Sequence, residues 1–212
     1  MFDLKNIEGK GYIGMITGNH DIPRLAHGRS IEEVKTAMVF LFTMPGVPFV
    51  YYGDEIGMDY ISGLKSKEGG YNRTGSRTPM QWDDRKNHGF STTEITYLPT
   101  DNRDGAPTVA AQLYNRDSLL SFMKKLISYR RNTPALSPNA DFEILNAGYP
   151  FTFIRSNGEQ FIYIAINPSN TQFSLELQID LDVMLNQNVA INDTTINMDG
   201  VSFLIGKIID NK

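Results

Sequence analysis

The first part of the chain contains two short apolar runs, each followed by polar residues. Residues 11–17 form the first run, and Asn, His and Asp fill positions 19–21. Residues 47–52 form the second run, which ends at the Gly, Asp and Glu of positions 53–55. A segment that is apolar on both faces is typical of a buried parallel strand. We therefore predict two parallel strands with polar groups at their carboxyl ends.

A helix is predicted between these strands. Ser30 and Glu33 have the spacing of a capping box, in which each side chain accepts a hydrogen bond from the backbone of the other residue. Apolar residues then recur three and four positions apart, up to Pro45-Gly46, as on the buried side of an amphipathic helix. They are Ile31, Val34, Ala37, Met38, Leu41 and Phe42. Strand, helix and strand make a right-handed βαβ unit, in which functional groups gather at the carboxyl ends of the strands.

The rest of the chain divides into an irregular segment, a second helix and a series of strands. Residues 57–115 show little periodicity, and so long an irregular segment usually serves as an active-site wall or lid. A helix capped by Asp117 is predicted over residues 117–131. Beyond Pro138, short apolar strands alternate with Asn, Gly and Pro, which indicates an antiparallel β-sandwich. We place the domain boundary between residues 1–136 and 137–212.

Composition and charge narrow the classes of function. The formal net charge of -4 argues against nucleic acid as a partner, because binding phosphates requires clustered Lys and Arg. The absence of Cys excludes disulfides, thiol nucleophiles and Cys-based zinc sites, and slightly favours a reducing compartment such as the cytoplasm. No stretch approaches the roughly 18 apolar residues that a membrane-spanning helix requires, and the first residues do not form a signal peptide.

The polar cluster Asn19-His20-Asp21 is the first candidate site. Taken alone, such a cluster is more often a turn or a cap than a catalytic group. Its place at the carboxyl end of a predicted buried strand changes that estimate, because polar side chains are costly to bury there without partners. A polyhydroxylated ligand would supply them, since a carboxylate accepts hydrogen bonds from hydroxyls and an imidazole donates one.

Several segments, taken in order, resemble the α-amylase superfamily of glycoside hydrolases, and within it the α-glucosidase, oligo-1,6-glucosidase and trehalose synthase subgroup. Residues 16–24 resemble the family's fourth signature region, and residues 46–58 its next barrel strand and loop. Residues 75–83, followed by residues 89–91, resemble the loop typical of this subgroup. Residues 107–112, which lead into residues 118–120, resemble a further segment of the same subgroup. The resemblance implies an α/β part that is the C-terminal portion of a (β/α)8 TIM barrel, followed by an antiparallel β-sandwich, the family's domain C.

The family resemblance also assigns roles to residues of this chain. The mechanism implied is retaining chemistry at an α-glucosidic bond of short gluco-oligosaccharides, with a nucleophile and an acid/base carboxyl group that flank the bond. Asp21 matches the third carboxylate, which stabilises the transition state. His20 and Asn19 match positions that bind the same sugar, and Arg24 and Arg77 are expected to contact sugar hydroxyls or acidic neighbours.

Other candidates in the chain have simpler explanations. Asp54 and Glu55 are adjacent, so on an extended chain they point to opposite faces and cannot flank one glycosidic bond. Trp82 and Tyr71 could form a stacking wall for a sugar, but a core Trp beneath a loop explains Trp82 equally well.

No segment of the sequence resembles the family's nucleophile and acid/base regions. We therefore expect the chain to be a C-terminal fragment that is inactive alone, with the N-terminal barrel portion of a parent chain as its missing partner. No cofactor or metal ligand is expected from this segment, and any calcium in the parent would be bound by earlier parts of the barrel. Two alternatives stay open, namely part of a trehalose synthase-like isomerase and a non-catalytic module for sugar binding or packing.

Overall fold

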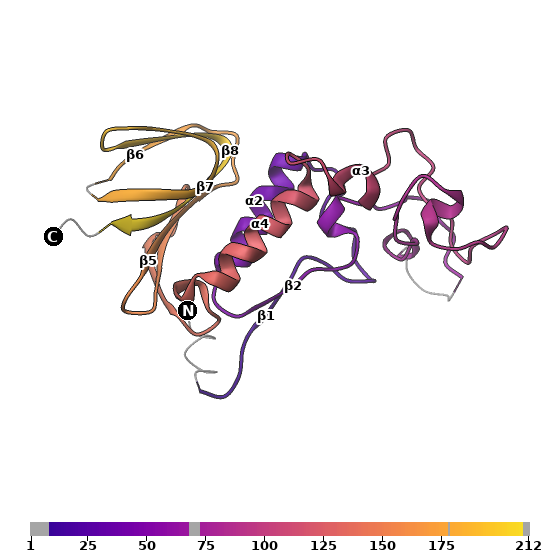
Figure 1. Ribbon diagram of the computed structural model, residues 1–212, viewed down its shortest axis with the longest axis horizontal. Coiled ribbons are helices and arrows are strands. Elements are labelled where there is room, and N and C mark those ends of the chain that lie inside the picture. Colours follow the sequence, from indigo (N-terminus) through magenta and orange to yellow (C-terminus); the bar gives the residue numbers. More distant parts are fainter. Residues whose placement is uncertain (1–8, 68–72, 178, 210–212) are drawn as a thin grey trace. The chain divides into compact units, whose positions relative to one another are not determined.

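The computed structural model describes residues 9–67, 73–177 and 179–209 (Figure 1). Its contacts divide the chain into two compact units that are discontinuous in sequence. One unit comprises the residues up to 15, residues 35–48 and the chain from 126 onward, and the other comprises residues 16–34 and 49–125. Because these units group residues by contact, the domain boundary between residues 136 and 137 stays a prediction.

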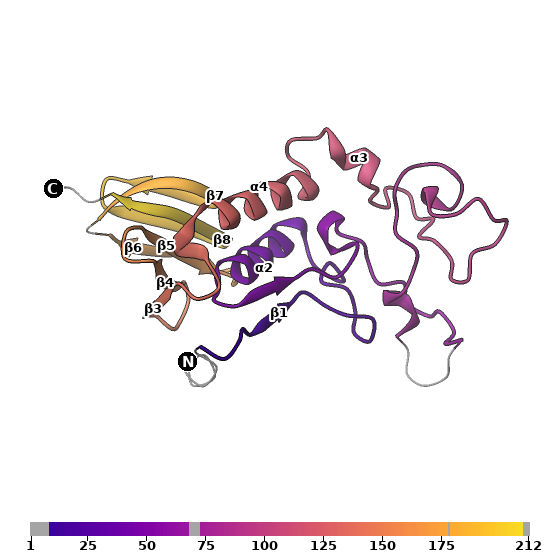
Figure 2. The ribbon, with the colours of Figure 1, turned by 60° about the horizontal axis from the view of Figure 1, so that its bottom comes forward.

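The predicted βαβ unit is present. Strand β1 (Gly14–Ile16) pairs with β2 (Val47–Phe49) in a two-stranded sheet, and helix α2 (Ile31–Thr43) connects them (Figure 2). The amide of Val47 donates to the carbonyl of Ile13 at 2.8 Å, and the amide of Thr17 donates to the carbonyl of Phe49 at 3.0 Å. From the first bond to the second, the residue numbers rise on both strands, from 13 to 17 and from 47 to 49, so the two strands are parallel.

The two strands are shorter and more exposed than the apolar runs predict. The side chains of Ile16 and Phe49 are 54% and 58% exposed, whereas a buried parallel strand would be covered on both faces. No third strand extends this sheet among the described residues, which explains the exposure.

Helix α2 begins and ends as its sequence predicts. Ser30 N donates to Glu33 Oε2 at 2.7 Å, and Glu33 N donates to Ser30 Oγ at 3.2 Å, which completes the capping box. The predicted apolar side is largely buried, although Ile31 at its start is 44% exposed. The helix stops at Thr43, and Gly46 follows with a positive φ of 97°.

The long segment between β2 and the second large helix contains only short helices. They are η1 (Asp54–Ile56), η2 (Thr74–Ser76), η3 (Lys86–Gly89) and α3 (Val109–Leu113), and the last of these was not predicted. Arg103 joins distant parts of the segment, because it donates to both carboxylate oxygens of Asp101 and to Asp59, at 2.6 to 2.9 Å. Asp59 also bonds His27 Nδ1 at 2.7 Å.

The second large helix, α4, spans Leu119–Asn132 and is followed by η4 (Pro134–Leu136). Its cap is Ser118 and not Asp117, as Ser118 Oγ accepts from the amide of Ser121 at 3.2 Å. The amide of Asp117 instead donates to the side chain of Asn115 at 3.0 Å, within the preceding turn.

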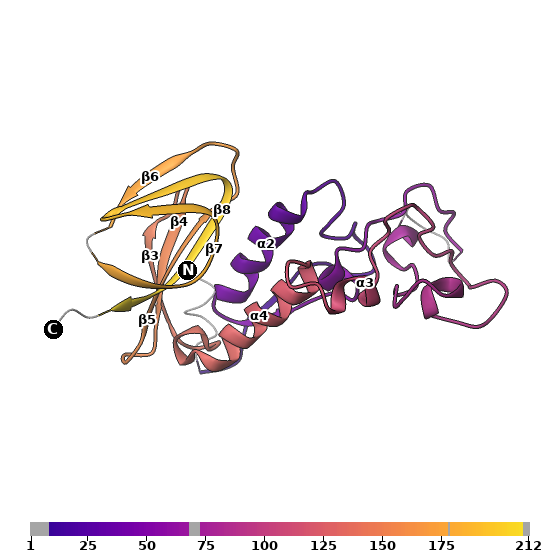
Figure 3. The same cartoon turned by 45° about the horizontal axis from the view of Figure 1, so that its top comes forward.

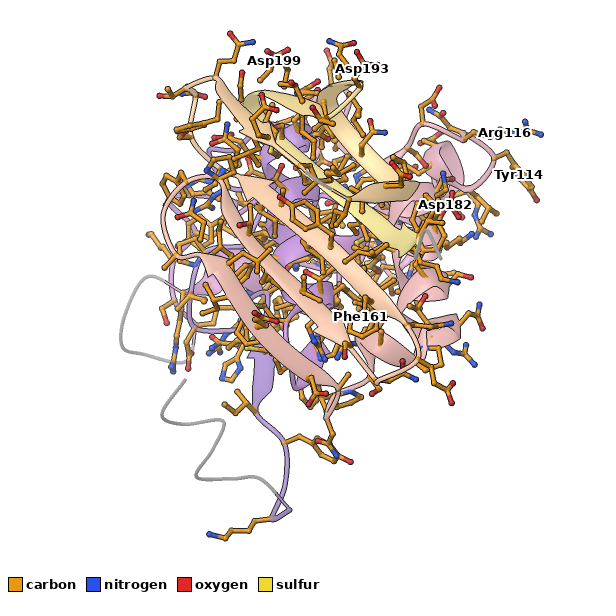
Figure 4. The ribbon with its side chains drawn as sticks, turned by 90° about the vertical axis from the view of Figure 1, so that its left-hand side faces the viewer. Tyr114, Arg116, Phe161, Asp182, Asp193 and Asp199 are labelled. Carbon is orange, nitrogen blue, oxygen red and sulfur yellow. The ribbon has the colours of Figure 1, made fainter. Side chains whose placement is uncertain are left out.

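The C-terminal part is an antiparallel β-structure, as predicted. Its strands are β3 (Asp141–Asn146), β4 (Phe151–Ser156), β5 (Phe161–Asn167), β6 (Phe173–Glu176), β7 (Asp180–Asn192) and β8 (Thr195–Ile209). They form one curled sheet in the order β3-β4-β5-β8-β6, with β7 paired to β8 (Figure 3). Figure 4 shows this sheet with Phe161 on β5, Asp182 on β7 and Asp193 in the turn between β7 and β8.

The curl arises because β8 pairs with different strands along its length. Residues 195–198 of β8 pair with β6, and residues 202–207 pair with β5. The sheet therefore bends over its own apolar face and encloses a core. The buried members of this core are Tyr163, Ala165, Ile196, Met198 and Leu204.

Two arginines, Arg155 (buried) and Arg130 (half-buried), bind backbone carbonyls at and near the end of α2. The side chain of Arg155 is fully buried and donates to the carbonyls of Thr43, Ser137, Ala140 and Asp141, at 2.5 to 3.3 Å. Arg130 donates to the carbonyls of Phe42, Met44 and Gly46, at 2.5 to 3.1 Å. Carbonyls at a helix end have no partner within the helix, so these guanidinium groups satisfy them.

Candidate functional site

Asp21 lies in the turn that follows β1, and two arginines of the long irregular segment converge on it. Its Oδ1 accepts hydrogen bonds from Arg73 at 2.7 Å and from Arg77 at 3.0 Å. His20 Nε2 is 3.4 Å from Asp21 Oδ2, and the Asp21 side chain stays 45% exposed. The carboxylate is thus held in place from one side and open to solvent on another.

The electrostatic surroundings keep this carboxylate ionised. Desolvation raises the pKa of Asp21, but the hydrogen bond from Arg77 and the charges of Arg73 and His20 outweigh it, so the net pKa lies below the ordinary value of 3.8. An ionised, exposed and oriented carboxylate can accept hydrogen bonds from hydroxyl groups or stabilise a developing positive charge.

Asn19 and His20 lie beside Asp21 in the same turn. Asn19 Oδ1 accepts from the amide of Asp21 at 2.7 Å, which fixes the backbone of the turn. The His20 side chain is 62% exposed, so its imidazole is open to a ligand. Arg77 Nε donates to the carbonyl of His20 at 3.0 Å, so Arg77 holds both the backbone and the carboxylate of this cluster.

Arg24 occupies a different environment from the other predicted site residues. It is 1% exposed, and its guanidinium lies over the rings of Tyr51 and Tyr52 at 5.1 and 4.7 Å from their centroids. It donates to the carbonyl of Tyr52, while its Nε and its second terminal nitrogen have no hydrogen-bond partner among the described residues. The structure therefore brings Asn19, His20, Asp21 and Arg77 together at the surface and buries Arg24.

Asp54 and Glu55 differ in exposure and in hydrogen bonding. Asp54 is fully buried and accepts from Thr17 Oγ1 at 2.6 Å, and its burial raises its pKa. Glu55 is half-buried and accepts from the amide of Gly53 at 2.6 Å. The two residues lie in the short helix η1 and not on an extended strand, which corrects the geometry assumed from the sequence.

A cavity of about 390 Å³ includes Arg77 in its wall. Its lining comes from the end of β2 and from the irregular segment, and consists of Tyr52, Glu55, Arg77, Pro79, Met80, Trp82, Phe90, Tyr97 and Leu98. Trp82 is 49% exposed and is therefore not a core residue. Tyr71, the other residue considered for a stacking wall, lies outside the described residues.

Arg73 and most of the aromatic lining were not predicted from the sequence as site residues. Arg73 precedes Arg77 by four positions, but nothing in its local pattern indicates a contact with Asp21. Phe90 lies in the stretch 89–91 that resembles the family's loop, but the resemblance gave it no role. Tyr97 lies in a segment without periodicity, where no local pattern indicates a site residue.

The described residues contain neither a metal-binding cluster nor a membrane-spanning helix. In residues 9–67, 73–177 and 179–209, no group of three or more His, Asp or Glu side chains could hold a metal ion. Within the same ranges, no helix has the length and apolar character to cross a membrane.

A parallel βαβ unit with polar clusters at the carboxyl ends of its strands is the repeating unit of (β/α)8 barrels, whose active sites lie at that end of the strands. The model of the alpha-amylase catalytic domain matches residues 3–139, and the chain belongs to this family.

Relatives of known name agree with this assignment. A glucan 1,6-alpha-glucosidase of Streptococcus pneumoniae is 30% identical over 85% of this chain and 40% of its own length. An alpha-glucosidase of Apis mellifera is 28% identical over 91% of this chain and 36% of its own. The human amino acid transporter heavy chain SLC3A1 is 37% identical over 57% of this chain and 19% of its own. The chain thus spans less than half the length of these relatives.

Solved structures confirm the fold. An isomaltulose synthase of Erwinia rhapontici NX5 in complex with D-glucose superposes with a TM-score of 0.82, at 22% identity, over 97% of this chain and 44% of the synthase. A trehalulose synthase in complex with Tris gives 0.80 at 22% identity, over 96% of this chain and 45% of that protein. At this level of identity the similarity concerns the fold.

Proposed function

We propose that this chain supplies the transition-state-stabilising carboxylate, Asp21, of a retaining α-glucosidase-type enzyme that acts on short α-linked gluco-oligosaccharides. The observation that carries the proposal is the environment of Asp21, a carboxylate with a lowered pKa that two arginines orient while it stays open to solvent. Retaining glycosidases pass through an oxocarbenium-like transition state, and a fixed negative charge beside it is stabilising.

The neighbours of Asp21 have supporting roles in this proposal. His20 donates to a hydroxyl of the sugar, and its exposed imidazole supports this role. Asn19 holds the turn and contacts the same sugar, while Arg77 orients the carboxylate and reaches the substrate. Direct contact of Arg24 with sugar stays a prediction, and its burial against two tyrosines supports a positioning role for it.

We further propose that the chain alone does not turn over substrate. Retaining hydrolysis needs a nucleophile and an acid/base carboxyl group about 5 Å apart. Near Asp21, Asp54 is buried and Glu55 is bonded to the backbone, so neither matches these roles. The chain spans 36% to 40% of its glucosidase relatives, which supports a division of the catalytic groups between this segment and the remaining barrel.

Hydrolysis of p-nitrophenyl α-glucoside tests this proposal. We expect background turnover for the chain alone, and turnover when it is combined with the N-terminal barrel portion of the parent protein. Asp21→Ala should lower kcat of the combined protein by at least about 100-fold, the scale for the loss of one electrostatic stabiliser. Asp84→Ala, at an exposed position, is the matched control. Turnover by the chain alone that disappears in Asp21→Ala would overturn the division of catalytic groups.

Two other functions have observations in their favour. The isomaltulose and trehalulose synthases found by fold favour an isomerase, and product analysis on maltose and sucrose would reveal isomers in place of free monosaccharides. The transporter heavy chain SLC3A1 favours a non-catalytic role. A combined protein that folds but hydrolyses neither maltose nor isomaltose would support that second alternative.

A further inference from the structure

Two adjacent tyrosines that follow β2 hold the backbone on both sides of Arg77. The Tyr51 hydroxyl donates to the carbonyl of Ser76 at 3.2 Å, and the Tyr52 hydroxyl donates to the carbonyl of Thr78 at 2.8 Å. These carbonyls belong to the residues immediately before and after Arg77. The position of the Arg77 backbone therefore depends on a pair of side chains that lie 25 and 26 positions earlier in the chain.

The segment around Arg77 is closely packed on its other sides as well. Ser76 and Thr78 are buried, and the hydroxyl of Ser76 donates to the carbonyl of Ile22. On the preceding residue, Gly75, an added Cβ would lie 2.3 Å from the carbonyl oxygen of Ile61. The segment cannot shift without losing these contacts, so its backbone has one well-defined position.

This fixed backbone determines how two arginines reach Asp21. Arg73 and Arg77 lie at the two ends of the short helix η2, and both donate to Oδ1 of Asp21. An arginine side chain is long and flexible, and ordering it costs up to about 2 kcal/mol of side-chain entropy. An ion pair with a partly exposed carboxylate rarely offsets such a cost unless its geometry is favourable. With its backbone held, Arg77 has only its side chain left to order when it bonds Asp21.

The tyrosine pair is itself held in place. The guanidinium of Arg24 lies over both rings, and the centroids of the two rings are 4.7 Å apart at an angle of 56°. The amide of Tyr51 donates to Thr17 Oγ1 at 2.9 Å, at the end of the strand that leads to the candidate site. Burial raises the pKa of Tyr51, so its hydroxyl stays protonated and able to donate.

We propose that Tyr51 and Tyr52 are positioning residues for Asp21, which act by fixing the backbone of Arg77. Any effect on turnover rests on the proposed function, but the effect on the Asp21 carboxylate does not. Neither hydroxyl contacts the substrate in this role. Replacement of either tyrosine by phenylalanine keeps the ring beside Arg24 and releases one of the two carbonyls that flank Arg77.

The pKa of Asp21, measured by NMR titration of the chain, tests this proposal. The hydrogen bond from Arg77 lowers this pKa, so a less ordered Arg77 should raise it. We expect a higher Asp21 pKa in Tyr51→Phe and in Tyr52→Phe, and a larger rise when both are replaced. In the combined protein the double variant should lower kcat at least about threefold and keep KM within about twofold, because a misplaced carboxylate loses transition-state contacts first.

Tyr129→Phe is the matched control. The Tyr129 hydroxyl donates to the carbonyl of Met184 at 2.7 Å, so this variant also loses a bond from a tyrosine hydroxyl to the backbone. It should lower the midpoint of thermal unfolding as Tyr51→Phe does and leave the pKa of Asp21 unchanged. A rise in the Asp21 pKa as large in Tyr129→Phe as in Tyr51→Phe would overturn the proposal, because it would show a general loosening of the fold.

A double-mutant cycle shows whether the tyrosines act through Arg77. In an Arg77→Gln background, Tyr51→Phe should leave the pKa of Asp21 where Arg77→Gln alone places it. An equal rise with and without Arg77 would overturn the proposal. If Tyr51→Phe does not fold, the cycle is run with Tyr52→Phe, whose position is 39% exposed.

Failure of this proposal is distinguishable from failure of the proposed function. An Asp21 pKa that is the same in Tyr51→Phe, Tyr52→Phe and the unchanged chain overturns the positioning role, even where Asp21→Ala abolishes turnover. A raised pKa in both tyrosine variants supports the positioning role, even where Asp21→Ala leaves turnover of the combined protein intact and so defeats the proposed function.

Discussion

At the scale of single residues, the state of Asp21 depends on side chains far away in the sequence. Arg73 and Arg77 are 52 and 56 positions beyond it, yet both bond its Oδ1. The family pattern identified Asp21, His20 and Arg77 as site candidates. It gave no sign of Arg73, because a contact across that distance depends on how the irregular segment folds.

Removal of these arginines should raise the pKa of Asp21. Their hydrogen bonds and charges lower it, and the opposing desolvation remains when they are gone, so we expect Arg73→Gln with Arg77→Gln to raise the pKa of Asp21 even though the charge of His20 remains. The carboxylate would then become protonated at a higher pH, and the acid limb of any turnover would shift to higher pH with it. NMR titration of the Asp21 carboxyl measures the change.

Arg85→Gln is the matched control for this titration. Arg85 bonds Asp83 and holds the pKa of that carboxyl below its ordinary value, so its loss should raise the pKa of Asp83 and leave Asp21 unchanged. An Asp21 pKa that stays constant in the double variant would show that the two arginines do not determine its charge.

Arg155 is a second residue whose role depends on distant contacts. Arg155→Met should lower the free energy of unfolding by at least about 3 kcal/mol, because a carbonyl removed from water and left without a donor costs about 1 to 3 kcal/mol. Arg155 donates to one buried carbonyl, that of Thr43, and to three partly buried ones. Urea denaturation measures the loss. Arg131→Met, at an exposed position near the end of α4, should change stability by less than about 0.5 kcal/mol. Similar values for both variants would contradict the role of Arg155.

At the scale of elements, capping residues and Gly or Pro positions in the sequence predicted the ends of helix α2 well, whereas the apolar runs predicted the lengths of strands less well. The capping box of Ser30 and Glu33 is present because both partners lie within one turn of helix. The cap of α4 was misplaced by one residue, as Asp117 and Ser118 both have capping side chains and only the folded turn selects between them. Strand β8 extends well beyond the apolar run that predicted it, because pairing with β5, β6 and β7 carries polar residues into the sheet.

The turn between α2 and β2 has a glycine that no other residue can replace easily. At Gly46, φ is 97° and an added Cβ would lie 2.4 Å from the carbonyl oxygen of Ile13. Gly158 has a similar φ of 85°, but a Cβ added there would have no atom within 4 Å. Gly158→Ala should therefore lower the free energy of unfolding by only about 1 to 2 kcal/mol, the cost of an alanine in the left-handed region. We expect Gly46→Ala to exceed that by about 1 to 3 kcal/mol, because the backbone must also move. Equal losses in thermal unfolding would contradict the close approach.

At the scale of the whole molecule, the sequence predicted the order of parts and left their contacts undetermined. A βαβ unit, a long irregular segment, a helix and an antiparallel sheet all follow each other as expected. The compact units cut across this order, since residues near the start of the chain share a unit with its C-terminal strands. Hydrophobic periodicity indicates which face of an element is apolar. It does not indicate which distant segment of the chain packs against that face.

The parallel sheet of β1 and β2 should make the isolated chain associate. An isolated two-stranded sheet has marginal stability, and parallel sheets are normally covered on both faces. In this sheet, however, the side chains of Ile16 and Phe49 are 54% and 58% exposed. We expect sedimentation velocity to show association that grows with concentration. Phe49→Lys should suppress it, because a charged side chain on an exposed strand discourages pairing with another chain. Ile95→Lys, at an 88% exposed position of the irregular segment, should associate as the unchanged chain does. A chain that stays monomeric at all concentrations, or a Phe49→Lys variant that associates equally, would show that this face needs no partner.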